Sequence, residues 1–482
     1  MKLRKILDKV EIKNKIQDLN LDLEIESIFY DSRLVKANSL FVCLVGKNLD
    51  GHIFAQNAIQ NGAVYIITEK DLNLENQIIV NNTREVLAQI SDNFFEHPSR
   101  NLNIIAITGT KGKTTTASFI CDILNSSGQK TAKIGTLGAT FDNKIIETKN
   151  TTPESFEIQK FLRKYVDFNY KNVIIEASSL GLKNHRLDNI LINYAVFTNI
   201  SNDHIGTNEH ENFEDYLNSK IILFKNCKKA FINIDDKFCD KILKECKCEK
   251  ITFGFDKKAD VKFKHFSVNK ENFGSNFKIQ DQKFSISIPG KHNVYNAVAA
   301  IAVCQNMKIN TNIIKNALES CQVCGRSEII FKNSDFMIII DYAHNASGMK
   351  NILNFLRAYK PKRLVNLFGA GGNRARSRRF EMGKISGELA DLTVITSDNS
   401  RFESTLDIIF DIKTGILETQ GKFIVIPDRK EAIRYCIKNA KRGDVILLAG
   451  KGHELYQEIN GIFYHFDERE IVNSALREFN II

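Results

Sequence analysis

Residues 104–116 read Ile-Ile-Ala-Ile-Thr-Gly-Thr-Lys-Gly-Lys-Thr-Thr-Thr, an apolar run that stops at two glycines and a lysine. The pattern predicts a strand, a phosphate-binding loop and the start of a helix. Gly109 and Gly112 can adopt backbone angles that other residues avoid, so successive N–H groups can surround phosphate oxygens. Lys113 adds a positive charge, and Thr114 offers a hydroxyl to a magnesium ion. The stretch therefore predicts a site for a nucleoside triphosphate.

The spacing of this loop departs from the usual P-loop. The order here is Gly-x-x-Gly-Lys-Thr, whereas the usual pattern has four residues between its first glycine and the Gly-Lys pair. A glycine-rich turn without a ligand is the alternative. The residues that follow place Ala117, Ile120, Cys121 and Leu124 on one helical face, so the helix N-terminus would point toward a bound phosphate. This flanking pattern favours the phosphate loop.

Length and composition indicate a globular protein of several domains. The 482 residues exceed one ordinary core, and contents of 43% hydrophobic and 26% charged residues are typical of soluble proteins. Residues 1–20 mix charged and apolar side chains, so we expect no signal peptide, no membrane insertion and a cytoplasmic location. The formal net charge of +10 suits a nucleic acid or a small polyanion. Because the lysines do not cluster with aromatics, we expect no nucleic-acid partner.

Ten cysteines are scattered along the chain without a regular framework. In a long cytosolic protein this favours reduced thiols over disulfides. Cys321 and Cys324 have the spacing of zinc ligands, and Cys246 and Cys248 form a second close pair. The pairs lie far apart in sequence and no histidine cluster accompanies them, so we expect free thiols rather than a structural metal.

The order of elements predicts an α/β fold, and the length suggests roughly two to four domains. The central part would be a parallel-sheet P-loop ATPase, because continuous apolar strands separated by helices are typical of a sheet covered on both faces. Short strands and helices alternate before it and a Rossmann-like unit follows it, with boundaries at 1–99, 100–326 and 327–482. A proline at residue 98 indicates a linker over 97–100. The predicted strands are 25–29, 39–45, 63–67, 77–80, 104–108, 173–176, 194–199, 231–234, 336–340, 364–368, 392–396, 423–426 and 445–448.

Polar residues follow many of these strands. Ligands of parallel sheets lie beyond the carboxyl ends of the strands, so these residues are candidates for a site. Glu176 ends a buried strand, where a carboxylate is costly unless it is paired or bound to a metal. The polar ends of the C-terminal domain are 341–344, 369–374, 398–401, 428–429 and 450–454.

A series of motifs spans essentially the whole chain in a fixed order. They are Asp31-Ser-Arg33, Thr108 to Thr114, Thr151-Thr-Pro153, Glu176-Ala-Ser-Ser179, Asn199 to His204, Lys220, Gly290-Lys-His-Asn293 with Asn296, Gly325-Arg326, Asp341-Tyr-Ala-His344 and Gly450-Lys-Gly-His-Glu454. With these motifs the sequence resembles the Mur ligase family, the ATP-dependent amide-forming enzymes of peptidoglycan precursor synthesis, and within it the MurE type. The short phosphate loop is the form usual in this family.

The resemblance implies three domains: an N-terminal one that binds the UDP-linked substrate, a central ATPase and a C-terminal one that brings the incoming amino acid. It also implies a reaction and its cofactors. A MurE-type enzyme adds the third amino acid to UDP-N-acetylmuramoyl-L-alanyl-D-glutamate through an acyl phosphate, with ATP and Mg2+. We therefore expect small-molecule substrates and a monomer. The implied catalytic residues are Lys113, Lys220, Glu176 and His204. Magnesium would be held by Thr114, Glu176, His204 and Lys220, the last carrying a CO2-derived carbamate. The implied ATP residues are Gly109, Thr110, Lys111, Gly112, Lys113, Thr114, Thr115, Asn296, Arg326 and Asp341.

The same resemblance implies residues for the UDP-linked substrate, since hydroxyls and a guanidinium suit carboxylate and diphosphate groups. Two positions depart from the family pattern: Leu180 stands where His is common, and Asn184 where some members have Gln. The implied residues are Ser32, Thr151, Thr152, Ser178, Asn184 and Arg186.

The third amino acid is indicated by Asp398-Asn-Ser-Arg401. Enzymes of this type that use meso-diaminopimelate carry Asp-Asn-Pro-Arg, so Asn399 is kept and Ser400 replaces proline, which removes a fixed φ angle. An arginine can bind the distal carboxylate that diaminopimelate has and lysine lacks. Arg374, Gly450 and Glu454 match further positions that contact this amino acid.

We therefore expect meso-2,6-diaminopimelate, with L-lysine or lanthionine as alternatives. Another Mur-type or folylpolyglutamate-type ligase is a second alternative. A P-loop module that uses ATP to bind a macromolecule is a remote one, because it would need neither Lys220 nor Asn296.

Overall fold

The computed structural model describes residues 1–482 except 15–18, 47–48, 143, 202–204, 207–208 and 270–272. The chain forms two compact units. The first comprises Met1–Phe263 and Tyr295–Ala317, and the second comprises Lys264–Val294 and Leu318–Ile482. The predicted domain boundaries at 99/100 and 326/327 stay predictions.

The first unit begins with a small parallel sheet in the order β1-β2-β3-β4. Its strands confirm the four predicted here, although the second ends at Val42 rather than at residue 45. Residues Pro98–Asn101 form the 3-10 helix η3, and the buried Ser99 hydroxyl accepts a hydrogen bond from the Leu191 N–H at 3.1 Å. The linker predicted over 97–100 stays a prediction. The elements are α1 (Leu3–Ile6), β1 (Ser27–Phe29), η1 (Ser32–Leu34), β2 (Ser39–Val42), η2 (Gly51–Phe54), α2 (Ala55–Gln60), β3 (Ala63–Thr68), β4 (Gln77–Ile79) and α3 (Thr83–Phe94).

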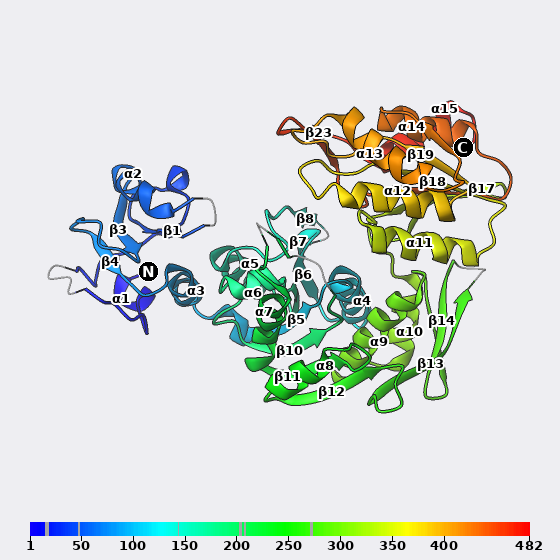
Figure 1. The fold of residues 1–482 in the computed structure, drawn as a ribbon. Coiled ribbons are helices and arrows are strands. Elements are labelled where there is room, and N and C mark those ends of the chain that lie inside the picture. The colour runs from blue at the N-terminus through cyan, green and yellow to red at the C-terminus, as the bar shows by residue number, and fades with distance from the viewer. Residues whose placement is uncertain (15–18, 47–48, 143, 202–204, 207–208, 270–272) are drawn as a thin grey trace. The chain divides into compact units, whose positions relative to one another are not determined.

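A larger sheet of the first unit has the order β12-β11-β10-β5-β9-β6-β7-β8, parallel from β12 to β6 (Figure 1). Ile104 and Ala106 of β5 join a core cluster with α5 (Ser155–Asp167), α7 (Phe213–Lys225) and α8 (Cys239–Glu245), while Ile105 and Ile107 are buried on the other face. The continuous apolar run is thus explained by burial on both faces. The strands are β5 (Asn103–Thr108), β6 (Thr131–Gly135), β7 (Gly138–Phe141), β8 (Lys144–Ile146), β9 (Asn172–Glu176), β10 (Ile192–Phe197), β11 (Cys227–Asn233) and β12 (Glu249–Gly254).

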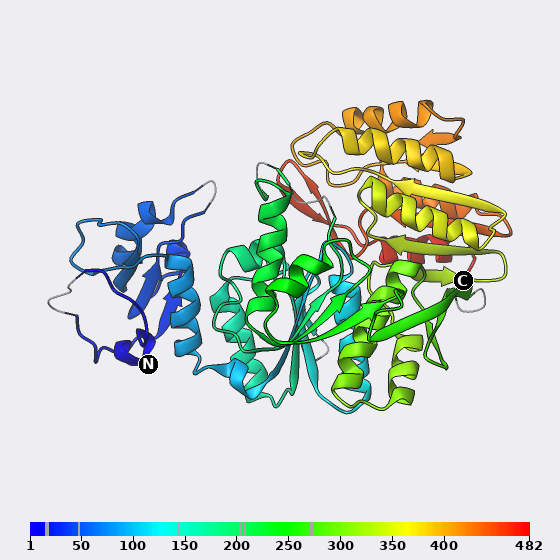
Figure 2. The ribbon, with the colours of Figure 1, turned by 60° about the horizontal axis from the view of Figure 1, so that its bottom comes forward.

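Helices follow the strands of this sheet in sequence (Figures 1 and 2). They are α4 (Lys113–Ser126), α5 (Ser155–Asp167), α6 (Ser179–Lys183), α7 (Phe213–Lys225) and α8 (Cys239–Glu245), followed after β12 by α9 (Lys291–Asn306) and α10 (Thr311–Ser320). β13 (Val261–Asn269) pairs with β12, and β14 (Gly274–Ile279) and β15 (Gln282–Ile286) form an antiparallel hairpin.

The second unit contains a six-stranded sheet in the order β16-β17-β21-β18-β19-β20, parallel except for β16. Alternate strand residues enter two cores: Leu364 and Phe368 pack with α11, α12 and α13, while Val365 and Leu367 pack with α14 and α15. This two-faced burial confirms the predicted Rossmann-like arrangement. The elements are β16 (Glu328–Lys332), β17 (Phe336–Asp341), α11 (Ala346–Ala358), β18 (Arg363–Phe368), α12 (Ser377–Leu389), β19 (Leu392–Ile395), α13 (Thr405–Leu417), β20 (Phe423–Val425), α14 (Arg429–Lys438), β21 (Asp444–Ala449), β22 (Tyr456–Ile459), β23 (Ile462–His465) and α15 (Glu468–Glu478).

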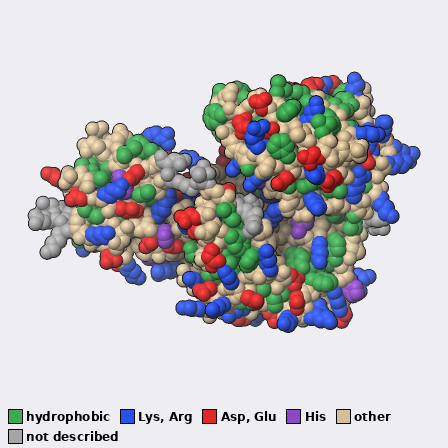
Figure 3. Space-filling model, viewed as in Figure 1, with side chains coloured by type: hydrophobic (Ala, Val, Ile, Leu, Met, Phe, Trp, Pro, Cys, Tyr) green, Lys and Arg blue, Asp and Glu red, His purple; other side chains and the backbone are tan. Residues whose placement is uncertain are grey.

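Basic side chains are spread over the face drawn in Figure 3 and are interspersed with acidic ones. None of the helices in the described part of the chain combines the length and the apolar character needed to cross a bilayer.

Candidate active site

The predicted phosphate loop joins β5 to α4, which begins at Lys113. Gly112 has φ +88°, a left-handed conformation that favours glycine. A Cβ atom on Gly112 would lie 2.2 Å from Oδ1 of Asn296, and one on Gly109 would lie 1.9 Å from Oγ1 of Thr198. The two glycines therefore allow the loop to pack closely against α9 and the end of β10, and they bring Asn296 beside the loop.

Hydrogen bonds hold the loop on the residues that follow β10. The N–H groups of Thr110 and Lys111 donate to the carbonyl and the side-chain oxygen of Asn199, at 2.8 and 3.0 Å. The Asn199 amide donates in return to the Lys111 carbonyl at 3.0 Å. The Lys113 ammonium donates to the carbonyls of Gly109 (2.7 Å) and Thr110 (3.2 Å). The lysine charge is thereby kept at the loop.

Glu176 ends β9 beside this loop and is 3% exposed. Its Oε2 accepts hydrogen bonds from the hydroxyls of Thr114 (2.9 Å) and Thr136 (3.0 Å), and its Oε1 accepts from the Thr136 N–H (3.1 Å). A Cβ on Gly135 would lie 2.2 Å from Oε1, so the glycine leaves room for the carboxylate. One carboxylate and two hydroxyls form the oxygen-rich donor set that a hard cation such as Mg2+ prefers. The predicted ligand His204 lies outside the described residues.

Lys220 lies on α7 and is 1% exposed. Its Nζ is 4.4 Å from the ring centroid of Tyr216, whose hydroxyl is 2.9 Å from Oγ1 of Thr110. Tyr216 therefore connects the buried lysine with the phosphate loop. The sequence reasoning missed Tyr216 and Thr136, because neither belongs to a recognisable motif.

His210 precedes α7 and is another residue that the sequence reasoning missed. Its Nδ1 lies 2.9 Å from the Asp215 carboxylate and its Nε2 lies 2.8 Å from the Ser179 hydroxyl. Burial lowers the pKa of His210, although Asp215 opposes this shift. The imidazole thus joins the start of α7 to the start of α6.

Four of the six residues predicted for the UDP-linked substrate lie near Thr152 or Glu176: Thr151, Thr152, Ser178 and Arg186. The Thr152 hydroxyl donates to the Glu176 carbonyl (2.7 Å) and accepts from the Ser178 N–H (2.9 Å). Arg186 donates to the Thr152 carbonyl (2.9 Å) and to Glu154 (2.6 Å). The hydroxyl of Thr151 lies 3.2 Å from that of Thr136, so the group is continuous with the surroundings of Glu176.

Two further predicted residues lie apart from this hydroxyl. Asn184 forms the C-cap of α6. Ser32 is buried on η1, where its carbonyl accepts a hydrogen bond from Asn61 at 2.9 Å. The described hydrogen bonds of neither residue reach the Thr152 hydroxyl.

In the second unit, Asp341 ends β17 and accepts hydrogen bonds from the N–H (2.7 Å) and hydroxyl (3.2 Å) of Ser327. Burial raises the pKa of Asp341, and the charge of Arg326 opposes that shift. The Arg326 guanidinium lies 4.8 Å from the Tyr342 ring centroid. Gly325 has φ +69°, and a Cβ there would lie 2.3 Å from the backbone nitrogen of His453. The Gly325-Arg326 turn is therefore packed against the loop after β21.

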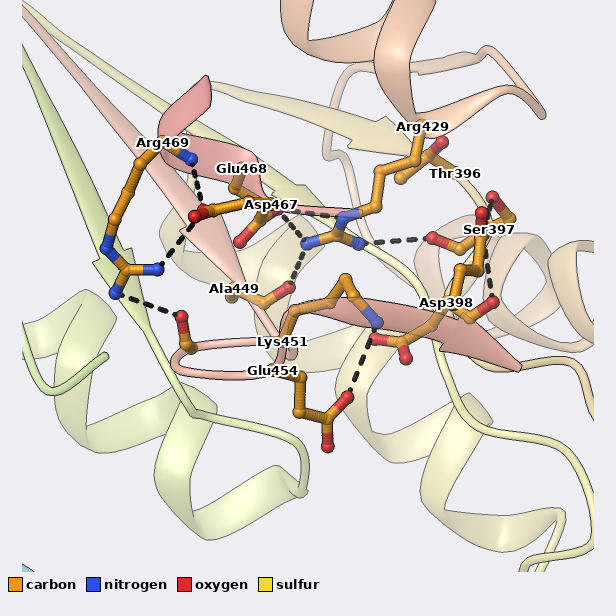
Figure 4. A network of polar contacts seen from close by, with 12 residues as sticks. Thr396, Ser397, Asp398, Arg429, Ala449, Lys451, Glu454, Asp467, Glu468 and Arg469 are labelled. Carbon is orange, nitrogen blue, oxygen red and sulfur yellow. Dashed lines mark hydrogen bonds and ion pairs between the residues drawn. The ribbon is translucent and has the colours of Figure 1, made fainter. Parts of the chain in front are cut away.

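Two of the residues predicted for the amino-acid substrate, Asn399 and Glu454, contact the ammonium group of Lys451, and Figure 4 shows this group beside Glu454. This group donates to Oδ1 of Asn399 at 3.0 Å and lies 3.3 Å from Oε2 of Glu454, to which the Asn399 amide donates at 2.8 Å. A Cβ on Gly450 would lie 2.6 Å from Oδ2 of Asp398. Burial raises the pKa of Glu454, and Asp398 raises it further. Lys451 belongs to the Gly450-Lys-Gly-His-Glu454 motif, although the sequence analysis predicted no role for it.

Arg401 is the last residue of the 398–401 segment, and its φ angle is +52°. Its Nε donates to Glu458 (3.0 Å) and its Nη1 donates to the Gly372 carbonyl (2.7 Å). Ser400 is buried, and a Cβ on Gly372 would lie 1.9 Å from its carbonyl oxygen. The glycine-rich turn after β18 is therefore in close contact with the predicted amino-acid loop. Arg374 of that turn is exposed, and the described contacts do not join it to Lys451 or Arg401.

A buried arginine, Arg429, contacts the residues from which the 398–401 and 450–454 segments begin. Arg429 pairs with Glu468, and the side chains of both residues are at most 1% exposed. The Arg429 guanidinium also donates to the carbonyl of Ala449 (2.8 Å), which is the last residue of β21 (Figure 4). It donates as well to the carbonyl of Ser397 (3.1 Å), which follows β19. It thus links the two strand ends from which the 398–401 and 450–454 segments leave. Sequence reasoning missed this role because a lone arginine after a strand carries no local signal.

A glycine-lysine loop at the end of a parallel sheet and a Rossmann-like unit with a polar rim fit an ATP-dependent ligase of the Mur type. Three family descriptions match the chain: "Mur ligase family, catalytic domain" over 24–103, "Mur ligase middle domain" over 107–304 and "Mur ligase, glutamate ligase domain" over 325–452. The chain belongs to the Mur ligase family, and the resemblance inferred from the motifs is confirmed.

Curated relatives cover nearly the full chain. A UDP-N-acetylmuramoyl-L-alanyl-D-glutamate–2,6-diaminopimelate ligase of Clostridium botulinum is 41% identical, over 94% of this chain and 96% of the relative. A ligase of the same name from Clostridium acetobutylicum is 39% identical, over 99% and 100%.

Solved structures have the same fold. A structure of an enzyme with that name has a TM-score of 0.72 at 28% identity, over 100% of this chain and 99% of its own. A MurF ligase from Thermotoga maritima, solved in complex with ADP, has a TM-score of 0.62 at 18% identity, over 95% and 98%, and so shows the fold alone.

Proposed function

We propose that this protein is the ATP-dependent ligase that joins meso-2,6-diaminopimelate to UDP-N-acetylmuramoyl-L-alanyl-D-glutamate in peptidoglycan precursor synthesis. The observation that carries this proposal is the contact of Asn399 and Glu454 with the buried Lys451, beside the close approach of Gly450 to Asp398, in a chain whose full-length relatives bear that name. We infer that the enzyme is a cytoplasmic monomer. Sedimentation of the purified chain would test the monomer directly.

The reaction has two steps. A carboxylate oxygen of the D-glutamyl group attacks the γ-phosphorus of ATP, which gives an acyl phosphate and ADP. The free amine then attacks the acyl carbon, and the tetrahedral intermediate expels phosphate as the amide forms. Both steps bring anions together, so the protein must mainly neutralise charge and align the reactants.

We assign the ATP phosphates to the loop of the first unit. Lys113 supplies a fixed positive charge, and the α4 N-terminus adds its dipole. The remaining assigned loop residues are Gly109, Thr110, Lys111, Gly112, Thr114 and Thr115. Asn296 qualifies because it lies in contact distance of Gly112. We also assign Arg326 and Asp341 to ATP, from the matching family motif.

The surroundings of Glu176 fit a magnesium ion, because the carboxylate and the hydroxyls of Thr114 and Thr136 supply oxygen ligands. When bound, the ion would neutralise phosphate charge. We assign Glu176, Thr114, His204 and a carbamate on Lys220 to metal binding. A carbamate would convert the buried Lys220 cation into an oxygen anion. Labelling with 13C-bicarbonate tests it: a carbamate carbon signal should appear, and it should be absent from a Lys220→Arg variant.

For the UDP-linked substrate we assign Ser32, Thr151, Thr152, Ser178, Asn184 and Arg186. The support is local geometry. The N–H of Ser178, two residues after Glu176, donates a hydrogen bond to the Thr152 hydroxyl. The Arg186 guanidinium donates to the Thr152 carbonyl. A carboxylate placed here would meet hydroxyl donors and one cation, which suits the D-glutamyl group.

Arg401 is assigned to the distal carboxylate of diaminopimelate. A guanidinium has five N–H donors, of which Glu458 and Gly372 accept two. The other donors can bind a carboxylate, an interaction that L-lysine does not offer. Ser400, Asp398, Asn399, Arg374, Gly450 and Glu454 complete the assigned amino-acid set.

One assay tests the whole proposal. ADP release is measured with the UDP-linked dipeptide and with meso-diaminopimelate, L-lysine or lanthionine in turn. We expect turnover with diaminopimelate. The Arg401→Ala variant should lose about 100-fold in kcat/KM for diaminopimelate and less than about threefold in KM for ATP, because it removes charged hydrogen bonds to one substrate only.

Arg442→Ala is the matched control, since this side chain is 80% exposed. It should leave both constants unchanged. Equal losses for ATP and diaminopimelate in Arg401→Ala would contradict the assignment of Arg401. Turnover with L-lysine alone would contradict the choice of amino acid. ADP release that needs RNA or DNA and no amino acid would overturn the ligase proposal.

A further inference from the structure

Three cysteines from separate elements meet at one end of the large sheet of the first unit. Cys227 begins β11, Cys246 is the C-cap of α8, and Cys248 directly precedes β12. The Sγ atom of Cys248 lies 3.3 Å from Sγ of Cys227 and 3.3 Å from Sγ of Cys246. All three sulfur atoms lie within 4.8 Å of one another.

The pairing of β11 with β12 creates this cluster. The two strands are parallel neighbours, with Lys229 opposite Glu249, so their amino ends lie side by side. The α8 connection returns Cys246 to the same end, where it is 3% exposed and packed in the core. The cysteine pair noted in the sequence therefore gains a third member, which lies 21 residues before Cys248 along the chain.

The spacing fits a shared cation. Three thiolates at the usual zinc–sulfur distance of about 2.3 Å in tetrahedral geometry are about 3.8 Å apart, a value inside the range of the cluster. Cysteine thiolates are soft ligands that prefer such d10 ions. Lys228 and Lys247 adjoin the cysteines in sequence and can offset part of the negative charge of a trithiolate site, whereas Glu245 and Glu249, which adjoin Cys246 and Cys248, add to it.

We infer that Cys227, Cys246 and Cys248 bind one thiophilic cation of the Zn2+ class. Among the described residues no further His, Cys, Asp or Glu joins the group, so a water molecule would take the fourth position. Binding converts three thiols into three metal–sulfur bonds and releases the protons that they still carry.

The inferred role is structural. The cluster lies at the amino ends of β11 and β12, whereas the phosphate loop follows the carboxyl end of β5, a strand of the same parallel run. The cation would therefore tie α8 and the start of β12 to β11 without contacting ATP. This inference does not depend on which amino acid the enzyme uses.

Cobalt substitution in the full-length protein tests the inference. After removal of metal by a chelator, Co2+ should bind with a stoichiometry of one per chain and give thiolate-to-metal charge-transfer absorption, which Zn2+ should then abolish. Zn2+ in excess should raise the Tm of the metal-free protein by about 5 °C. Cys246→Ser and Cys248→Ser should lose both responses.

Cys324→Ser is the matched control. It removes one member of the Cys321/Cys324 pair, whose spacing in sequence resembles a zinc motif, and it should keep both responses. Absence of charge-transfer absorption in the folded wild-type protein would overturn the inference, even if the serine variants fail to fold. Loss of the absorption in Cys324→Ser alone, or an intact mass lower by two hydrogens without bound metal, would also overturn it.

Discussion

Replacing Lys451 with methionine should destabilise the protein strongly. The ammonium group is fully buried and lies 3.3 Å from the Glu454 carboxylate. With an effective dielectric constant of about 20, two unit charges at this distance attract by roughly 5 kcal/mol. The cost of burying the ammonium group offsets part of this, so we expect the free energy of unfolding to fall by about 3–5 kcal/mol, the usual cost of breaking a buried pair.

The loss should depend on pH, because the variant leaves Glu454 beside Asp398 without its cation. Burial and then Asp398 already hold the pKa of Glu454 above its ordinary value, and removal of Lys451 raises it further. A carboxyl group whose pKa is higher in the folded state binds its proton more tightly there. The deficit of the variant should therefore be largest at neutral pH and should shrink as the pH falls through the folded-state pKa.

Urea unfolding followed by circular dichroism measures this, since the chain contains no tryptophan. Curves at about pH 7.5 and about pH 5.5 give the expected difference. Lys384→Met is the matched control, because its ion pair with Glu418 (3.1 Å) is exposed and should contribute at most about 1 kcal/mol. The reasoning is refuted if Lys451→Met loses no more stability than the control, or loses the same amount at both pH values.

Three further perturbations test the site. Gly135→Ala places a Cβ 2.2 Å from Oε1 of Glu176, so the magnesium concentration needed for half-maximal ADP release should rise about tenfold. The pKa of His453 is lowered to about 4, by burial first, so the folded state keeps this imidazole neutral. Stability should therefore fall by roughly 3 kcal/mol as the pH drops from about 6.5 to about 4, and urea titrations of His453→Gln should lack this contribution. Tyr216→Phe removes the hydroxyl 2.9 Å from Oγ1 of Thr110 and should cost about 1 kcal/mol in urea unfolding; an unchanged midpoint would contradict the contact.

Local sequence patterns sufficed for much of the fold. The apolar run 104–108 and its glycine-lysine loop predicted β5, the loop and the start of α4 because strand burial, glycine conformation and helix initiation depend on neighbouring residues. The five parallel strands predicted after residue 326 are confirmed for the same reason. The proline at residue 98 indicated a break in the helix, and α3 ends at Phe94.

The ordered motifs also identified the family, since each motif adds independent evidence. Only the tertiary structure showed which side chains share a contact. It showed that the Thr136 hydroxyl donates to Glu176, that the Lys451 ammonium group contacts Asn399 and Glu454, and that Cys227 lies beside Cys248. These residues are separated along the chain, and their meeting depends on strand order and register, which arise from packing of the whole unit rather than from any local pattern.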